Sequence, residues 1–501
     1  MSLVRNSAFT LASYALPVVV TLATVPLFIR YVGGERYGAL AIAWLLLGYF
    51  GQADFGIGRA LTQRISRHAR ADPQEVATIV WSAMLIIVAV GIATSAAVYG
   101  GAWWYFAGPF KVASGLRAEL LASIGLLAAC NLLVALNGVT MGALMGSERF
   151  VLLAWANLAG SVLMQLLPLA AAIWFDPGMP TLIAASLLAR ALAFAVVAAA
   201  LWRDILRGRR RRFSRKHMTG LVGFGKWIMV TSVIGPLMMF ADRFVIGNVL
   251  GAAAVAAYSI PFQMASRVAL LPTALVQVLF PRFATLKDAE AGRHCTDFTV
   301  FSALSLAIPV AGLVAMAEPL LRLWLGAALD PRSALVGQIL LCGFWINGVA
   351  AVPFNYTQAR GNPRFTALLH IAELPAYAAL LFGLGWLAGL AGLAAAFSVR
   401  CAIDCAALIL HAGIGTRALV MRVVSPAVLL LALVAAHPLT SDWPVGLIAA
   451  ILGGAMALTM FLRLAPADMI VKIVARVPSR WHEKVERVIL WSNPRSRSTN
   501  E

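Results

Sequence analysis

The chain contains 501 residues, of which 61% are hydrophobic and 12% are charged, and its mean hydropathy is +0.85. An ordinary soluble domain carries about 25% charged residues. The composition therefore excludes a soluble protein and indicates a polytopic integral membrane protein. The net charge of +19 suggests polyanionic partners at first sight, but most of the basic residues follow the topology pattern described below.

Long apolar windows recur along the whole chain. The hydrocarbon core of a bilayer is about 30 Å thick and needs about 20 apolar residues per helix. Such windows occur 14 times, 6 of them before a strongly basic segment at residues 203–217 and 8 after it. The first is longer than the core of a signal peptide, so we expect it to be retained as a span. The windows lie near residues 8–29, 39–60, 78–101, 118–141, 151–174, 181–202, 224–249, 253–277, 298–317, 334–356, 365–387, 389–411, 424–440 and 444–463.

The basic segment 203–217 fixes the expected topology. It contains 8 Arg and Lys residues and one acid, Asp204. Such a cluster stays on the cytoplasmic side, where anionic lipids attract it and translocation is resisted. With a cytoplasmic N-terminus, the inside segments hold 29 basic residues and the outside segments hold 6. We therefore expect both termini in the cytoplasm and anionic membrane lipids as partners, and no nucleic acid, because the segment is flanked by apolar spans.

The expected fold class is an all-α polytopic membrane protein of about 14 transmembrane helices, with two six-helix lobes and two C-terminal helices. A weak echo between the halves supports two lobes, since each half has a short outside turn after its first helix and a basic inside loop after its second. The tail is typical of an amphipathic helix on the inner leaflet followed by a disordered end. The expected parts are an N-terminal lobe at 1–202, a basic cytoplasmic linker at 203–221, a C-terminal lobe at 222–412, two further spans at 413–464 and the tail at 465–501.

Two features weigh against other classes of function. The five cysteines are an odd number and show no CxxC spacing, so neither a disulfide framework nor a zinc site is expected, and we expect no metal and no cofactor. The outside loops, such as residues 101–117 and 318–332, are short. A glycan polymerase or ligase would need a larger external loop to build a reaction centre, so we expect no catalytic residues.

Charged residues inside the spans are the candidate functional residues. Each costs at least about 2.5–3.5 kcal/mol at membrane depth, so such residues normally face a bundle interior or a wet cavity. Cations outnumber acids among them, which favours an anionic ligand, because the fork of an arginine pairs with phosphate oxygens. The basic residues are Arg190, Lys226, Arg243, Arg267 and Arg400, and the acids are Asp54, Asp242, Glu373 and Asp404.

Spacing suggests partners for some of these charges. Arg400 and Asp404 stand at i and i+4 and share a helix face, as do Gln263 and Arg267. The Arg400–Asp404 pair is either a self-neutralised structural pair or part of a binding site. Asp242 and Arg243 are adjacent and point about 100° apart, so they are not expected to serve one face.

The remaining cations have no obvious partner along the chain. Lys226 lies near a helix start, where it either reaches the cytoplasmic interface or binds a ligand. Arg190 and Arg267 are candidate cavity residues for an anionic substrate. Proline residues interrupt several spans, and broken helices are typical hinges of alternating-access carriers. They also occur in static bundles.

Two motifs carry a resemblance to a known family. The first runs from Pro26 through Phe28-Ile-Arg-Tyr-Val-Gly-Gly-Glu-Arg-Tyr-Gly38 to Asp54-Phe-Gly-Ile-Gly-Arg-Ala. The second is Ala241-Asp-Arg-Phe-Val-Ile-Gly-Asn-Val-Leu-Gly251 followed by Tyr258. Together they resemble the Wzx-type oligosaccharide flippases of the MOP superfamily. Asp54, Asp242 and Arg243 are the charged members of these motifs.

The resemblance implies a carrier in the bacterial inner membrane. It would move an undecaprenyl-pyrophosphate-linked oligosaccharide from the cytoplasmic to the periplasmic leaflet, through a central cationic cavity that opens alternately to each side. Only Asp54, Asp242 and Arg243 are carried over from the family's motifs. Charge placement, and not the resemblance, selects Arg190, Arg267, Arg400 and Lys226, which with Arg243 are the candidates for binding the anionic cargo. The acids Asp54, Asp242, Glu373 and Asp404 are the candidates for ion coupling or structural pairs. A monomer is expected, with a polysaccharide polymerase and chain-length proteins as candidate partners.

Three alternatives stay open from the sequence. One is a drug or cation antiporter of the same superfamily, against which the scarcity of central acids counts. A second is a lipid II flippase, which differs in cargo only. The third is the membrane glycan polymerase or ligase considered above.

Overall fold

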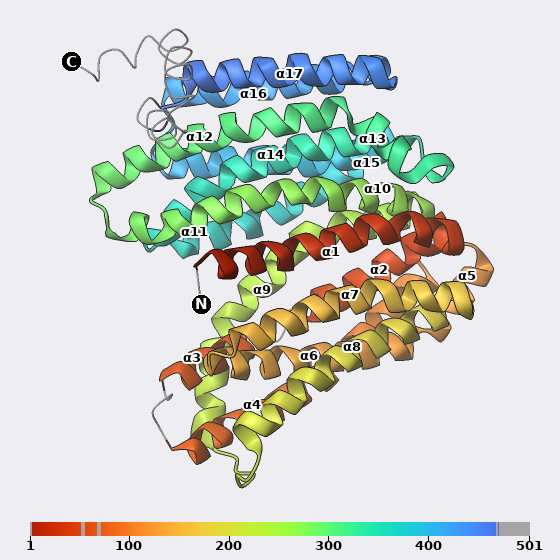
Figure 1. Ribbon diagram of the computed structural model, residues 1–501, viewed down its shortest axis with the longest axis vertical. Coiled ribbons are helices and arrows are strands. Elements are labelled where there is room, and N and C mark those ends of the chain that lie inside the picture. The colour runs from red at the N-terminus through yellow and green to blue at the C-terminus, as the bar shows by residue number, and fades with distance from the viewer. Residues whose placement is uncertain (1–2, 52–55, 68–71, 467–468, 470–501) are drawn as a thin grey trace. The chain divides into compact units, whose positions relative to one another are not determined.

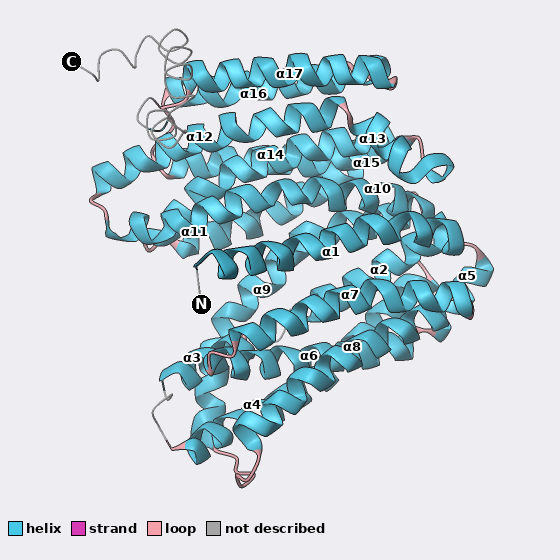
Figure 2. Ribbon diagram, viewed as in Figure 1, coloured by secondary structure: helices cyan, strands magenta, loops and turns pink. Residues whose placement is uncertain are grey.

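The computed structural model describes residues 3–51, 56–67, 72–466 and 469, in which helices are joined by loops. Figure 2 shows only helices and loops within these residues. The all-α prediction is therefore confirmed for them. Asp54 and nearly all of the tail at 465–501 lie outside the described residues.

Contacts divide the chain into two compact units, Met1–Ala256 and Ala257–Glu501. Each is described by itself. The first unit contains α1 (Leu3–Val32), α2 (Gly34–Gly51), α3 (Ile57–Arg67), α4 (Pro73–Ala107), α5 (Ser114–Ala122), α6 (Ile124–Gly146), α7 (Phe150–Trp174), α8 (Met179–Leu201), the π-helical turn η1 (Trp202–Leu206) and α9 (Arg215–Val249).

The division falls within α10 (Ala252–Ala265). The second unit continues with the 3-10 turn η2 (Ser266–Ala269), α11 (Leu270–Thr285), α12 (Asp288–Ala315), α13 (Ala317–Leu325), η3 (Gly326–Ala328), α14 (Arg332–Ala359), α15 (Pro363–His411), α16 (Arg417–Ala435), η4 (His437–Leu439) and α17 (Trp443–Leu464).

The helices coincide with the apolar windows of the sequence. Ten helical stretches of the described chain are long and apolar enough to cross a membrane. One of them, α15, contains two predicted spans, because the backbone is non-helical at Ala388 and Gly389 between them. The other expected windows are 8–29, which falls on α1, 224–249, which falls on α9, and 39–60, whose described residues fall on α2 and the start of α3. The structure thus supports a multi-pass membrane protein.

Polar side chains and a glycine join the helices of the first unit, where α4, α6, α7 and α8 run side by side (Figure 1). Buried Asn131 of α6 donates to the hydroxyls of Thr94 and Ser95 on α4, at 3.0 and 3.2 Å. Such bonds hold helices together where water is absent. Gly142 of α6 lies so close to α3 that an added Cβ would be 2.4 Å from the carbonyl oxygen of Gly58.

Segments that are expected on the same side of the membrane contact one another in the first unit. At one end, Arg36 of α2 forms a two-pronged ion pair with Glu119 of α5, whose carboxylate also accepts from the Met179 backbone N–H. At the other end, Arg64 donates to the carbonyl of His217, and Arg149 pairs with Asp204 at 3.0 Å. Expected outside segments thus meet one another, and so do expected inside segments.

Side chain to backbone bonds also connect the helices of the second unit. Trp345 of α14 donates to the carbonyl of Ala303 on α12 at 2.8 Å, and Ser302 of α12 donates to the carbonyl of Gly348 on α14 at 3.2 Å. Ser398 of α15 donates to the carbonyl of Ile339 on α14. These bonds place α14 between α12 and α15.

The span 224–249, which was expected to begin the second lobe at residue 222, lies in α9 and groups with the first unit by its contacts. This helix packs against α2, α3 and α4. The segment 203–221 runs from η1 into α9. The lobe boundaries and the role of this segment as a linker stay predictions.

Candidate functional site

A cavity in the first unit contains Arg190. It has a volume of about 240 Å³ and is lined by α6, α7 and α8. Its polar lining comes from Arg190 of α8, Asn137 of α6, and Asn157 and Ser161 of α7. Gly160 of α7, whose added Cβ would be 3.2 Å from the Cβ of Ala193 on α8, lies on the same wall.

The cavity offers unpaired polar atoms. Nε of Arg190 and Oδ1 of Asn137 are buried and have no hydrogen-bond partner among the described residues. No ion pair joins Arg190 to an acid in the described part of the chain. A guanidinium without a counter-charge at membrane depth is costly, and an anionic oxygen would compensate it with strong, charge-assisted hydrogen bonds. The structure places Arg190 in a cavity among three helices of the first unit, while its place in a central cavity and its binding of substrate stay predictions.

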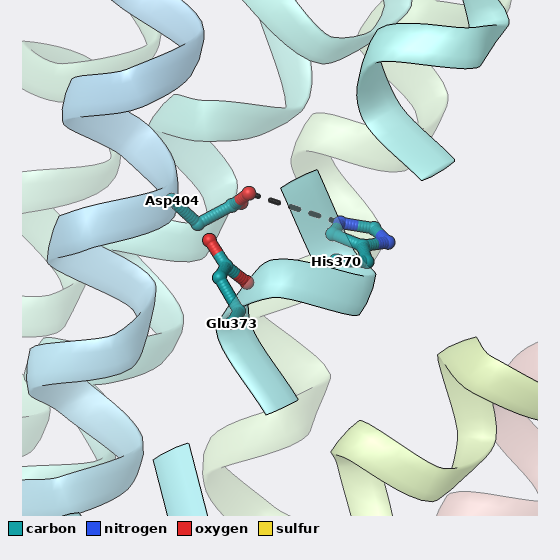
Figure 3. Close-up of side chains that lie close together, drawn as sticks. All are labelled: His370, Glu373 and Asp404. Carbon is teal, nitrogen blue, oxygen red and sulfur yellow. Dashed lines mark ion pairs between the residues drawn. The ribbon is translucent and has the colours of Figure 1, made fainter. Parts of the chain in front are cut away.

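A second cluster of charges lies within the second unit, on the two limbs of α15. Figure 3 shows His370 and Glu373 on one limb and Asp404 on the other, with the two carboxylates facing one another. Nε2 of His370 is 3.7 Å from Oδ1 of Asp404, and Nη1 of Arg400 is 3.9 Å from Oε2 of Glu373. Glu373 and Asp404 are buried.

The bend in α15 explains why these residues meet. Gly389 has a φ of 54°, in a region that L side chains rarely adopt. The chain reverses there, and Gly392 packs so tightly that an added Cβ would be 1.8 Å from the carbonyl oxygen of Leu384. Glu373 and Asp404 lie at nearly equal distances along the chain before and after this reversal. Antiparallel limbs therefore bring them side by side.

Arg400 and Asp404 lie one turn apart on one limb, as their spacing predicts, but no ion pair between them is seen among the described residues. The ion pair of Arg400 goes to Glu373, and Asp404 is next to His370. The guanidinium lies near the rings of Tyr377 and Phe397, at 5.5 and 5.4 Å from their centroids. Tyr377 belongs to the other limb of α15 and Phe397 to the same limb as Arg400, so cation–π attraction holds the guanidinium between the two limbs.

Asp242 and Arg243 form a buried ion pair, although adjacent residues point about 100° apart on a helix. Nη1 of Arg243 donates to Oδ1 of Asp242 at 3.1 Å and to the carbonyl of Met239 at 2.7 Å. The backbone N–H of Arg243 donates to the same carboxylate oxygen at 2.8 Å. The long arginine side chain thus folds back along α9 and reaches its neighbour, while a role of either residue in binding stays a prediction.

The remaining candidates are placed as follows. Arg267 lies in η2, between α10 and α11, and its side chain is exposed. Lys226 belongs to α9, and its side chain lies outside the described part of the structure. Neither Arg267 nor Arg243 lines the Arg190 cavity.

Sequence reasoning missed His370, Asn137, Asn157 and Ser161. His370 stands three residues before Glu373, which places both on one helix face. That spacing was a usable signal. The three residues of the cavity gave none, because isolated polar side chains are common in apolar spans.

The chain is similar to known proteins both in sequence and in fold. The family model described as "Polysaccharide biosynthesis protein" matches residues 3–287. The chain is 28% identical over 408 residues to the "Putative O-antigen transporter" of Shigella flexneri, covering 81% of this chain and 96% of that protein. Among solved structures it is similar to "Lipid II flippase MurJ, inward closed conformation", with a TM-score of 0.69, 16% identity and coverage of 91% of this chain and 98% of the other.

A further solved structure shares the fold. It is titled "Inward-facing conformation of a multidrug resistance MATE family transporter of the MOP superfamily". Its TM-score is 0.62 at 15% identity, and the match covers 83% of this chain and 95% of the other. The two solved structures show a common fold, and their low identities carry no statement about cargo.

Proposed function

This chain belongs to the polysaccharide biosynthesis protein family, and from that premise we propose that it is a flippase for lipid-linked oligosaccharide. It would carry undecaprenyl-pyrophosphate-linked repeat units from the cytoplasmic to the periplasmic leaflet of a bacterial inner membrane, for polysaccharide export. The similarity to an O-antigen transporter supports this cargo over lipid II and over drugs. The relatives are named as transporters and flippases, which favours transport over glycan polymerisation or ligation.

The Arg190 cavity is the observation that carries the proposal. A lipid-linked oligosaccharide presents a pyrophosphate beside sugar hydroxyls. The guanidinium of Arg190 can bind the pyrophosphate, because its planar fork pairs with phosphate oxygens. Asn137, Asn157 and Ser161 line the same cavity and can exchange hydrogen bonds with hydroxyls. A drug or metal cation would instead be repelled by an uncompensated arginine.

The orientation belongs to the same proposal. The basic segment 203–217 and Arg64 lie at the end of the first unit that would face the cytoplasm. Arg36 and Glu119 would face the periplasm. Both termini would be cytoplasmic, and the carrier would work as a monomer by alternating access, with a polymerase and chain-length proteins receiving its product.

Arg190→Gln tests the proposal in a strain from which the gene has been deleted. The deletion strain should accumulate complete lipid-linked repeat units that an impermeant sugar-modifying reagent cannot reach, because they remain in the inner leaflet. Arg190→Gln should restore export at least tenfold less well than the unchanged protein. Arg190→Lys should be intermediate, because lysine keeps the charge and loses the fork.

Arg364→Gln is the matched control, since Arg364 is exposed and no ion pair is seen for it among the described residues. It should export normally. Equal membrane abundance and equal elution from a sizing column would show that the Arg190 variants fold. Normal export by folded Arg190→Gln would refute the role of the cavity. Repeat units that reach the periplasm and stay unpolymerised in the deletion strain would favour the enzyme alternative.

A further inference from the structure

Beyond transport, we propose that His370, Glu373 and Asp404 form a binding site for a divalent transition-metal cation such as Zn²⁺. One ligand atom from each residue lies within 4.8 Å of the other two. The sequence predicted no metal site, because it was sought in cysteine patterns. The inference holds whatever cargo the protein carries, so its failure would leave the proposed function standing.

The carboxylates of the cluster are buried without adequate partners. Glu373 is 5% exposed and Asp404 is 6% exposed. Both oxygens of Glu373, and Oδ1 of Asp404, have no hydrogen bond within the described residues. Burying charged groups in this way is costly unless they are paired or coordinate a metal. The orphaned oxygens therefore point to a ligand that supplies positive charge.

Arg400 does not complete the site. Its Nη1 is 3.9 Å from Glu373, which is beyond hydrogen-bond distance. With a neutral His370 and both carboxyl groups ionised, one guanidinium leaves one negative charge uncompensated. A cation bound between the carboxylates would remove this deficit.

The donor set favours a transition metal over other cations. One imidazole nitrogen with two carboxylate oxygens suits Zn²⁺ and its neighbours, whereas Mg²⁺ and Ca²⁺ prefer oxygen ligands alone. Bonds of about 2.0–2.2 Å place neighbouring ligand atoms about 3–3.5 Å apart. The 3.7 Å between His370 and Asp404 is close to this spacing, and rotation of the Glu373 side chain would bring in the third ligand.

The histidine is already oriented for this role. Its ring is stacked on Phe354 of α14, with centroids 5.8 Å apart and planes 11° apart. This contact limits rotation of the ring, and Nε2 is the ring nitrogen near Asp404. A metal held by His370 and Glu373 on one limb and by Asp404 on the other would join the two limbs of α15 (Figure 3).

The test measures metal binding to the full-length protein in lipid nanodiscs. Co²⁺ is added while its visible absorption bands are recorded, and Zn²⁺ is then used to displace it. One equivalent should bind at the site. His370→Asn, Glu373→Gln and Asp404→Asn should each weaken Zn²⁺ binding at least tenfold. Arg400→Gln should strengthen it several-fold, because a repelling charge is removed.

The surface pair of His294 and Glu290 provides the control. Its atoms are 3.9 Å apart, and the two side chains are 38% and 48% exposed, far more than Glu373 and Asp404. His294→Asn should leave the affinity unchanged. Elution from a sizing column and helix content would confirm that each variant is folded.

Three outcomes would overturn the proposal. The first is unchanged Zn²⁺ affinity in folded His370→Asn. The second is loss of binding with His294→Asn, which would assign the metal to the surface. The third is displacement of Co²⁺ by Na⁺ or Mg²⁺ at equal concentration, which would indicate an oxygen-only cation site.

Discussion

Replacing Asp242 with alanine should destabilise the first unit strongly. The change leaves the guanidinium of Arg243, 4% exposed, without the carboxylate that it contacts at 3.1 Å. At this distance the Coulomb attraction is about 5 kcal/mol for an effective dielectric constant of about 20. Removing one partner of a buried ion pair typically costs about 3–5 kcal/mol. We expect the lower end, because Arg243 keeps its bond to the carbonyl of Met239.

Unfolding by a denaturing detergent in mixed micelles would measure this free energy. The double variant Asp242→Leu with Arg243→Met is the informative companion, because replacing a whole buried pair by apolar residues is often neutral or stabilising. It should recover most of the loss. Wild-type stability of Asp242→Ala, or a double variant less stable than the single one, would refute the reasoning. A stable double variant that cannot export would show that the pair also serves transport.

Three further predictions concern packing, pH and topology. Gly142→Ala should lower the free energy of unfolding by about 1–3 kcal/mol, because the added methyl group would push α3 away from α6. Gly125→Ala on the same helix has open space at its Cβ and should not lower it. Equal effects of the two variants would contradict the close contact of α3 with α6. The guanidinium of Arg36 and the N–H of Met179 hold the pKa of Glu119 below its usual range. Stability from this pair, about 1 kcal/mol or less, is therefore present at neutral pH and lost as the pH falls through the acid range, and Glu119→Gln should abolish that part of the pH dependence of unfolding. The native cysteines are buried and should give little background labelling. An impermeant thiol reagent should label Gly115→Cys in intact cells and spare Arg209→Cys. The reverse pattern would show that the topology is the opposite of the expected one.

Hydropathy predicted the helices well, because the bilayer demands long apolar runs and leaves few other arrangements. The bend of α15 between the windows 365–387 and 389–411 is confirmed at Ala388 and Gly389. Charge placement also selected Arg190, which lines a cavity. These features depend on composition within single segments.

Features that depend on packing between segments were not accessible. His370 meets Asp404 because the reversal at Gly389 sets the register of the two limbs, and a helical spacing rule sees one limb at a time. The angle of 100° between Asp242 and Arg243 describes Cβ directions, whereas the arginine side chain is long enough to fold back. The grouping of α9 with the first unit follows from contacts that no linear pattern encodes.

The basic segment between α8 and α9 is held by more than charge. The side-chain amide of Gln74 donates to the backbone carbonyl of Arg210 at 2.9 Å and accepts from the backbone N–H of Arg210 at 3.0 Å. Both backbone groups of Arg210 are thus bonded, as they would be beside a neighbouring β-strand. The N–H of Ser214 donates to Ser82, and Arg211 lies over the ring of Trp81. Exposed loops are the usual sites of proteolytic nicking, and trypsin must draw several residues in extended form into its cleft. The arginine-rich segment, bonded along α4 in this way, should therefore resist trypsin. Replacing Gln74 and Ser82 by residues that cannot make these hydrogen bonds should make it sensitive.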